Sequence, residues 1–320
     1  MQARRRRAAF RMPSVDTCHG RTMTHPVADR VPSKLTLGVA VTTALVCLLS
    51  ACGGTATSDG KSQAGACTQA EIDPASFVDP TRDTNPYHPL KPGMQWVRGG
   101  TTEVGSRKVP FTVTSTMTDV VRQIDGVPAI AMLDESTDAG EVAEVGMDYL
   151  ALDKDGNVWI FGGYTEAYEG GQFTDVESAW LGASDSTLVG ILAPAKVTAD
   201  TPQWCISAAD GEKPSVGKPV EVGVKHCVKF GCYKDVRVVQ EGEVDAPDNE
   251  NKYYAPGVGV IDNVPLDASL HQDTFQLLNF IELTPSGTAR KSKLVLDLEA
   301  HARTVAPDVF ADAPDAKRVR

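Results

Sequence analysis

The chain has 320 residues, with 31 lysines and arginines against 42 aspartates and glutamates, so its formal net charge is −11 at pH 7. This acidic balance disfavours binding to nucleic acid and to anionic lipid. The apolar share of 42% is ordinary for a globular protein and excludes disorder of the chain as a whole.

The first predicted element is an export signal. Arg30 and Lys34 form a positive flank, residues 35–50 are predominantly apolar, and Leu49-Ser50-Ala51-Cys52 closes the run. This run is shorter than the roughly 20 apolar residues that a permanent membrane helix needs. It resembles the lipobox of bacterial lipoproteins, in which a peptidase cuts before a cysteine that carries a diacylglycerol. A plain secretory signal, cut after Ser50-Ala51, is the alternative.

We therefore predict residues 23–51 as a lipoprotein signal peptide and Cys52 as the lipidation site. Two lipid chains on one residue give lasting attachment, here to the outer face of the cell membrane. Residues 1–22 hold a basic run upstream of the signal, and we interpret them as an over-extended start, with translation beginning at Met23. Residues 52–84 begin rich in Gly, Ser, Thr and Ala, and we predict a flexible tether there.

Removal of the signal makes the protein more acidic. Residues 1–51 contain eight basic and two acidic residues, so the other 269 residues carry 23 basic against 40 acidic ones, a net charge of −17. The membrane contact is therefore expected through the lipid on Cys52, and no nucleic-acid partner is expected.

If Cys52 is lipidated, four cysteines are left after the cut, and four cysteines allow three connectivities. We expect one bridge within the domain, from Cys205 to Cys227 or Cys232. A zinc site of Cys227, Cys232 and His226 is the weaker alternative, because the spacing lacks a second Cys or His pair.

Residues 85–283 are predicted to form one β-rich domain. Alternating residues at 111–116 indicate a half-buried strand, and Asp125-Gly126, between 120–124 and 127–133, indicates a type I′ hairpin. Further hairpins are expected around 153–157 and 169–172. Successive hairpins predict a mainly β fold, an antiparallel meander forming a curved sheet, a sandwich or an open barrel.

The end of the chain differs from this pattern. Thr284-Pro285 is typical of a helix start, so residues 284–303 are predicted as a C-terminal helix with Leu294, Leu298 and His301 on one face. The stretch 293–298 also alternates as a strand would. Residues 304–320 are predicted as a tail that is frayed from Ala311 onward.

No catalytic constellation stands out. Asp153-Lys154-Asp155-Gly156-Asn157 is interpreted as a turn and not as a calcium loop, because its glycine is fourth and not sixth. Residues 182–186 lack the last glycine of a nucleophile elbow. The histidines show no HExxH pattern, and there is no phosphate loop or dinucleotide fingerprint, so neither a metal nor a cofactor is expected.

Six aromatic residues within two hairpins are the candidate ligand pocket. They could line a concave sheet for an apolar or carbohydrate ligand, although core and cross-strand packing is the commoner role of such residues. They are Trp159, Phe161, Tyr164, Tyr168, Phe173 and Trp180.

Four stretches together resemble the recurring motifs of an uncharacterised family of β-rich secreted lipoproteins, mainly from high-GC Gram-positive bacteria. They are Asn85-Pro86-Tyr87-His88-Pro89-Leu90-Lys91-Pro92-Gly93, Asp153-Lys154-Asp155-Gly156-Asn157-Val158-Trp159-Ile160-Phe161-Gly162, Gly190-Ile191-Leu192-Ala193-Pro194-Ala195 and Lys252-Tyr253-Tyr254-Ala255-Pro256-Gly257-Val258-Gly259. The chain departs from the family at Gly163, where an acidic residue is expected, and at its three later cysteines. The resemblance implies a location and a fold but no activity.

These observations predict a membrane-anchored envelope protein that binds a small ligand, a glycan or a protein partner without catalysis. An extracytoplasmic hydrolase of wall polymer or peptide is the first alternative, and a structural or assembly factor is the second. An aromatic pocket favours binding, two carboxylates facing each other across a deep cleft favour the hydrolase, and a flat apolar patch favours assembly.

Overall fold

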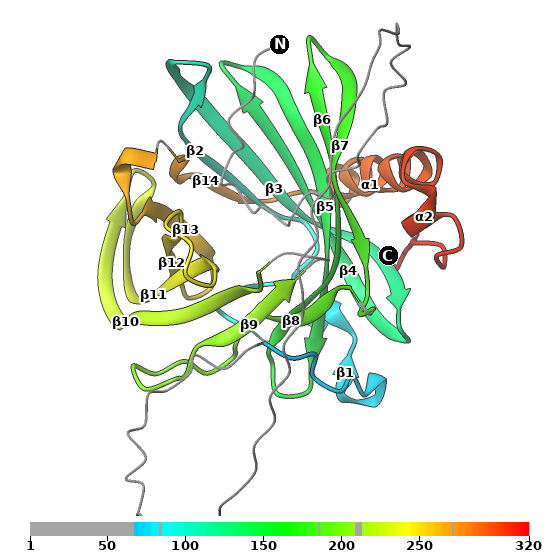
Figure 1. Ribbon diagram of the computed structural model, residues 1–320, viewed down its shortest axis with the longest axis horizontal. Helices are drawn as coiled ribbons and strands as arrows, with labels where there is room; N and C mark the ends of the chain where they lie inside the picture. Colours follow the sequence, from blue (N-terminus) through cyan, green and yellow to red (C-terminus); the bar gives the residue numbers. More distant parts are fainter. Residues whose placement is uncertain (1–66, 83–84, 185, 209–212, 271, 320) are drawn as a thin grey trace, which may run out of the picture. The chain divides into compact units, whose positions relative to one another are not determined.

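The structure is a computed structural model, and it describes residues 67–82, 85–184, 186–208, 213–270 and 272–319. The predicted signal peptide, the start at Met23 and the lipidation site Cys52 therefore lie outside the described residues. Within them, the predicted β-rich domain and the C-terminal helix are both present (Figure 1).

The domain is a closed antiparallel barrel of twelve strands, and its closure is the difference from the predicted open barrel. The hydrogen-bonded order runs β5-β4-β3-β2-β14-β13-β12-β11-β10-β9-β8-β6, and β6 pairs with β5 to complete the ring. The twelve strands are β2 (Met94–Val104), β3 (Arg107–Ile124), β4 (Val127–Asp138), β5 (Glu141–Asp153), β6 (Val158–Glu169), β8 (Leu188–Ala193), β9 (Trp204–Ala208), β10 (Ser215–Val228), β11 (Gly231–Glu243), β12 (Glu250–Ala255), β13 (Gly259–Pro265) and β14 (Thr274–Glu282).

Three further strands attach to this ring, and short 3-10 helices lie in its connections. Strand β1 (Phe77–Val78) pairs with β5, β7 (Gln172–Leu181) pairs with β6, and β15 (Lys317–Arg318) pairs with β3. The 3-10 helices are η1 (Pro74–Ser76), η2 (Pro80–Arg82) and η3 (Ala268–Leu270).

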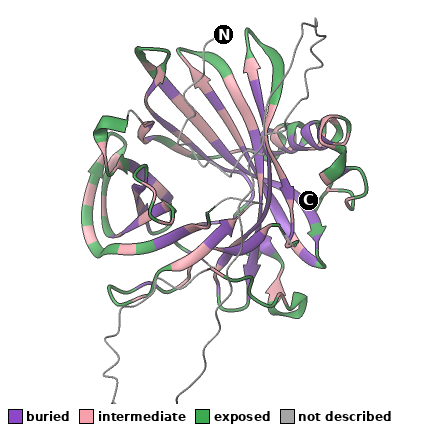
Figure 2. Cartoon of the chain, in the orientation of Figure 1, coloured by how far each residue is buried: buried purple, intermediate pink, exposed green. Residues whose placement is uncertain are grey.

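The turns follow from local sequence. Asp125 and Gly126 have φ of 51° and 78°, the two positive values that a type I′ turn needs, so this predicted hairpin is confirmed. The strands of the other predicted hairpins are also paired, β5 with β6 and β6 with β7. Figure 2 shows exposed residues at the hairpin tips and buried residues along the strands between them.

Helix α1 (Pro285–Val305) begins as predicted, because the Thr284 hydroxyl accepts a hydrogen bond from Gly287 N and proline occupies the first turn. It packs against β3 on the outer side of the barrel (Figure 1). Its buried face includes Val295, Leu298 and Ala302. The predicted face was wrong in one residue, because Leu294 is exposed and points away from the sheet.

The C-terminal tail is held in place, which corrects the prediction that it is frayed. A second short helix, α2 (Pro307–Phe310), buries Phe310, and β15 adds to the edge of β3. Nε and Nη2 of Arg318 donate to the two oxygens of the buried Asp119 carboxylate, each at 2.9 Å. Burial raises the pKa of Asp119, but the hydrogen bonds from Arg318 and Ser292 outweigh it and lower this pKa overall.

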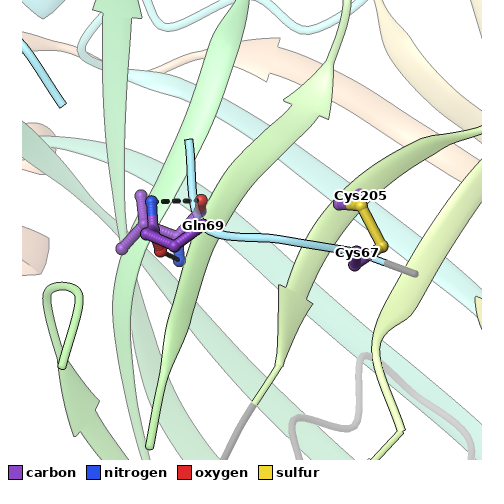
Figure 3. Close-up of a disulfide and its surroundings, with 4 residues drawn as sticks. Cys67, Gln69 and Cys205 are labelled. Carbon is purple, nitrogen blue, oxygen red and sulfur yellow. Dashed lines mark hydrogen bonds between the residues drawn. A yellow bond between two sulfur atoms is a disulfide. The ribbon is translucent and has the colours of Figure 1, made fainter. Parts of the chain in front are cut away.

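The predicted tether of residues 52–84 was too long, because residues 67–82 belong to the folded domain. Phe77 packs edge-on against the rings of Trp159 and Phe161 on β6, at centroid distances of 5.6 and 5.3 Å. Cys67 forms a disulfide with Cys205 on β9, and the Gln69 amide pairs with the backbone of Val189 on β8 (Figure 3).

The cysteines pair differently from the predicted bridge. Cys205 bonds Cys67, whereas Cys227 and Cys232 bond each other as opposite residues of the β10–β11 hairpin. The expected link between Cys205 and the hairpin was therefore wrong. Sequence spacing carried no information on this point, because the partner of Cys205 comes from a segment that was expected to be unstructured.

Candidate functional site

The candidate site is the interior of the barrel, and the period of the strands builds it. Successive side chains of a strand point to opposite faces, so every second residue of a strand faces inward. Positions 96 and 98 of β2, 111, 113 and 115 of β3, 132, 134 and 136 of β4, 144, 146 and 148 of β5, and 250 and 252 of β12 line one cavity. The intervening Glu135 of β4 instead pairs with Lys291 of α1, on the outside.

The cavity has a volume of about 140 Å³. Its walls combine apolar side chains with an unusual number of charged ones. The apolar walls come from Trp96, Phe111, Val113, Met132, Met147, Val258, Val260 and Phe275. The polar lining comes from His88, Arg98, Ser115, Asp134, Ser136, Glu144, Asp148, Thr165, Glu250 and Lys252.

One side of the cavity is organised by Arg98. Its Nε donates to the Val260 carbonyl at 2.9 Å, and its Nη1 donates to Ser115 Oγ, also at 2.9 Å. Ser115 in turn hydrogen-bonds Asp134, so the guanidinium reaches that carboxylate partly through a hydroxyl. Arg98 is therefore fixed by the wall, and its charge is directed to the Asp134 side of the cavity.

A second charged group, Lys252, lies in the wall formed by β11 and β12. Its ammonium contacts Glu241 at 2.9 Å and Glu250 at 3.2 Å, and all three side chains are nearly inaccessible. Burial opposes its charge, but the two carboxylates raise the pKa of Lys252, so it stays charged. Tyr254 also donates to Glu241.

Asp134 and Asp148 are neighbours on paired strands. Met132 is opposite Asp148 and Asp134 is opposite Gly146, so the two aspartates are diagonal neighbours on the inner face. Such diagonal positions are about 7–8 Å apart, within reach of each other. Burial raises the pKa of Asp134 to about 6, and burial together with the charge of Asp134 raises the pKa of Asp148 well above its usual value. Both carboxyls therefore hold a proton more tightly than they would in water.

The cavity also contains polar atoms without a protein partner. They are His88 Nδ1, Asp134 Oδ1 and Ser136 Oγ, and the whole Ser136 residue is 5% exposed. Burial, followed by the positive charge of Arg98, lowers the pKa of His88 to about 4, so its imidazole is neutral. A buried polar atom without a partner costs roughly 1–3 kcal/mol, which a bound polar molecule would recover.

Contacts of the segment that begins at Asn85 hold His88 in the cavity. These contacts bring together all four stretches that resemble the lipoprotein family. The buried Asn85 amide donates to the carbonyls of Gly156 and Ala193, each at 3.0 Å. Gly257 N donates to the Pro86 carbonyl at 2.7 Å. The segment from 85 to 92 is therefore tied to three other parts of the barrel, and these contacts hold His88 against the cavity.

The six aromatic residues predicted as a ligand pocket lie elsewhere, and none of them lines this cavity. Trp159 and Phe161 pack on Phe77, Tyr164 packs on Phe310 of α2, and Trp180 is part of the hydrophobic core. Phe173 contacts Tyr168 and His301. They pack the terminal segments against the outside of the barrel and do not form a ligand pocket there.

The other patterns weighed in the sequence have local structural roles. The Asp153 carboxylate accepts hydrogen bonds from the backbone of Asp155 and Asn157 and from the Trp159 indole, as a turn residue does. His301 contacts the buried Glu166 at 2.6 Å, outside the barrel, and His226 contacts Asp262 at 2.7 Å. His271 lies outside the described residues.

Sequence reasoning missed the cavity residues because their pattern has two interpretations. Alternate polar residues on a strand usually face water, so Asp134, Ser136, Glu144 and Asp148 read as surface positions. One available signal was the alternation of polar and apolar residues at 144–149 of β5, whereas residues 134–138 of β4 are polar at every position. The register that aligns them on one enclosed face comes from barrel closure.

Comparisons with known proteins identify no family for the chain and carry no argument about the site. No family model matches the sequence, and no curated protein matches it. A solved structure from Bacteroides fragilis NCTC 9343, a presumed exported protein with a YmcC-like fold, aligns with 60% of this chain and 97% of its own at 11% identity and a TM-score of 0.34. A likeness this weak carries no argument about function. Within the described residues, no helix combines the length and apolar character needed to cross a membrane.

Proposed function

We propose that this chain is an exported, lipid-anchored envelope protein that binds a small molecule inside its barrel without transforming it. The observation that carries the proposal is the cavity, whose aromatic and charged lining presents the unpartnered Ser136 Oγ and His88 Nδ1. Concave sites with apolar walls and a few converging polar groups are typical of ligand pockets.

The size of the cavity favours binding over hydrolysis of a polymer. A cavity of about 150 Å³ holds a molecule the size of benzene, and this one has about 140 Å³. A wall glycan or a peptide segment is much larger. The Asp134 and Asp148 pair is the observation that favours the alternative, a hydrolase, since paired carboxylates serve as acid and base. Such chemistry would be limited to substrates of few atoms.

Two observations support an extracytoplasmic location. The disulfides Cys67–Cys205 and Cys227–Cys232 fit an oxidising compartment. The apolar run before Cys52 fits export. The anchor is tested by Cys52→Ala, which should release the protein from the membrane fraction of its host, whereas continued sedimentation with membranes would overturn the anchor.

Binding is tested by filling the cavity. The soluble Cys52→Ala chain would be screened by thermal shift and native mass spectrometry against amino acids, amines, monosaccharides and short carboxylic acids. Ser136→Leu adds two heavy atoms to the side chain in the cavity and should abolish the binding seen with the parent chain. Thr137→Leu is the matched control, because Thr137 is the next residue of β4 and faces outward.

Equal ligand binding by Ser136→Leu and the parent chain would refute the interior site. The absence of any bound compound across the screen would refute the binding function as stated. Turnover of a bound compound that is lost in both Asp134→Asn and Asp148→Asn would establish the hydrolase instead.

A further inference from the structure

We propose that the ligand of the barrel cavity is a small organic cation, an alkyl ammonium ion, held by Asp134 and Asp148 against the aromatic wall. This inference rests on the proposed binding function and names the chemical class of the ligand. It follows from the balance of charge in the cavity, from the absence of partners for particular atoms, and from the shape of the walls.

The lining has more acidic than basic groups. Four carboxylates, Asp134, Glu144, Asp148 and Glu250, share the cavity with Arg98 and Lys252, while the His88 imidazole is neutral. The ammonium of Lys252 already contacts Glu250 and also Glu241, which lies behind the wall. Within the cavity, Arg98 is the cation that acts on Asp134.

Asp134 and Asp148 offer acceptors to a ligand in the cavity. Asp134 Oδ1 is buried without a partner, and the carboxyl of Asp148, its diagonal neighbour, lines the same cavity. Ser136 Oγ, on the same face of β4 two residues from Asp134, is a third acceptor and, like Asp134 Oδ1, has no partner. An ammonium group has three N–H donors, so it matches these three acceptors.

An anionic ligand fits this site poorly. Two nitrogens of Arg98 already donate to Val260 and Ser115, and Lys252 is enclosed by two carboxylates, so a bound anion would also face the acidic groups of the lining. An inorganic cation is also disfavoured, since no group of three His, Cys, Asp or Glu residues in the described part of the chain is arranged to hold a metal ion. An organic cation, with one charged end and an apolar body, fits the acceptors and the walls together.

The walls complete the match. Trp96, Phe111 and Phe275 line the cavity, and aromatic faces attract cations. Arg98 already makes such a contact, with its guanidinium carbon 5.7 Å from the Trp96 ring centroid and 6.0 Å from that of Phe275. The volume of about 140 Å³ suits an alkyl ammonium of about six heavy atoms.

Binding should release protons. Burial raises the pKa of Asp148 well above its usual value and that of Asp134 to about 6. A cation placed beside them favours their ionised forms, so each ammonium ion bound should displace up to one proton to the buffer. The charged groups that line the cavity with the pair are Arg98, Lys252, Glu144 and Glu250, and Glu135 acts on Asp134 from outside the barrel.

The test uses three probes of one shape on the soluble Cys52→Ala chain. Butylammonium, butanol and butyrate differ mainly in charge, and their binding would be measured by isothermal titration calorimetry at pH 7 in two buffers of different ionisation enthalpy. We expect butylammonium to bind at least about tenfold more tightly than the other two. The difference in heat between the buffers should report the release of protons.

Asp148→Asn is the decisive variant, because asparagine has the shape of the protonated acid and should fold, yet it cannot ionise. It should weaken butylammonium binding about tenfold or more and abolish the proton release. Glu135→Gln is the matched control, since Glu135 adjoins Asp134 in β4 but bonds Lys291 outside the barrel, and it should change both quantities far less than Asp148→Asn does.

Each other outcome overturns the inference in a distinguishable way. Equal binding of butanol, or tighter binding of butyrate, would refute the cationic class while leaving the cavity as a binding site. Butylammonium binding without proton release, or its survival in Asp148→Asn, would refute the role of the aspartates. Failure of all three probes would also refute the cationic class, and the Ser136→Leu screen would then decide separately whether the cavity binds anything.

Discussion

The two disulfides differ most in the length of chain that they close, and this difference predicts unequal contributions to stability. Cys67 and Cys205 are 138 residues apart, whereas Cys227 and Cys232 are 5 apart. Loop-closure entropy then assigns about 5 kcal/mol to the first bond and about 2 kcal/mol to the second. Cys67→Ser/Cys205→Ser should therefore lose about 3 kcal/mol more free energy of unfolding than Cys227→Ser/Cys232→Ser.

The contacts beside the first bond moderate this loss. When the bond is removed, Gln69 still pairs with Val189, and Phe77 still packs on Trp159 and Phe161. Full loss of the entropic term is therefore expected only if the segment stays attached in the native state. Detachment of residues 67–82 would relieve part of the destabilisation and would also expose the indole of Trp159.

The assay is urea unfolding followed by circular dichroism for the barrel and by tryptophan fluorescence for the segment. Coincident transitions would show that the segment stays attached, and an early fluorescence change would show that it detaches first. Equal destabilisation by the two double variants, or a larger loss for the hairpin pair, would refute the argument from loop length.

Two further predictions concern buried polar contacts. Burial raises the pKa of Glu299 to about 7 despite its ion pair with Arg122. The folded state therefore binds the proton more tightly than the unfolded chain does. The free energy of unfolding should then fall by about 2–3 kcal/mol as pH rises from about 4.5 to about 7. Glu299→Gln should flatten that decline in urea unfolding measured across this pH range, and an unchanged slope would contradict the assignment. Asn85→Ala leaves the Gly156 and Ala193 carbonyls without their donor and should lower the free energy of unfolding by about 2–4 kcal/mol. The control, Asn279→Ala at an exposed position of β14, should change it by less than about 0.5 kcal/mol. Similar effects of the two substitutions would show that Asn85 does not hold the segment.

Local features could be predicted where all the residues that determine them lie within one short stretch. The Asp125-Gly126 turn follows from two residues that tolerate positive φ, and the start of α1 follows from Thr284-Pro285. Burial within the helix was less predictable. Leu294 has the chemistry of a core residue, but the sheet meets the face that carries Val295 and Leu298.

Long-range pairings were mispredicted for a common reason. The partner of Cys205 lies 138 residues away in a stretch whose composition resembles a tether, and β15 is held by Asp119 of β3 and not by its own sequence. Neither segment forms a stable element alone, because a two-residue strand has too few hydrogen bonds. Each is ordered by a surface that exists only after the barrel has formed.

The sequence by itself determined that the domain is a chain of antiparallel hairpins followed by one helix, since alternation, turn residues and a helix cap act over a few residues. Tertiary structure alone decided that β6 returns to β5 and closes the ring. This closure turns polar residues that resemble a solvent face, such as Asp134, Ser136, Glu144 and Asp148, into the wall of a cavity. It also decides their chemistry, because burial raises the pKa values of carboxyls such as Asp134 and Asp148 above those they would have in water.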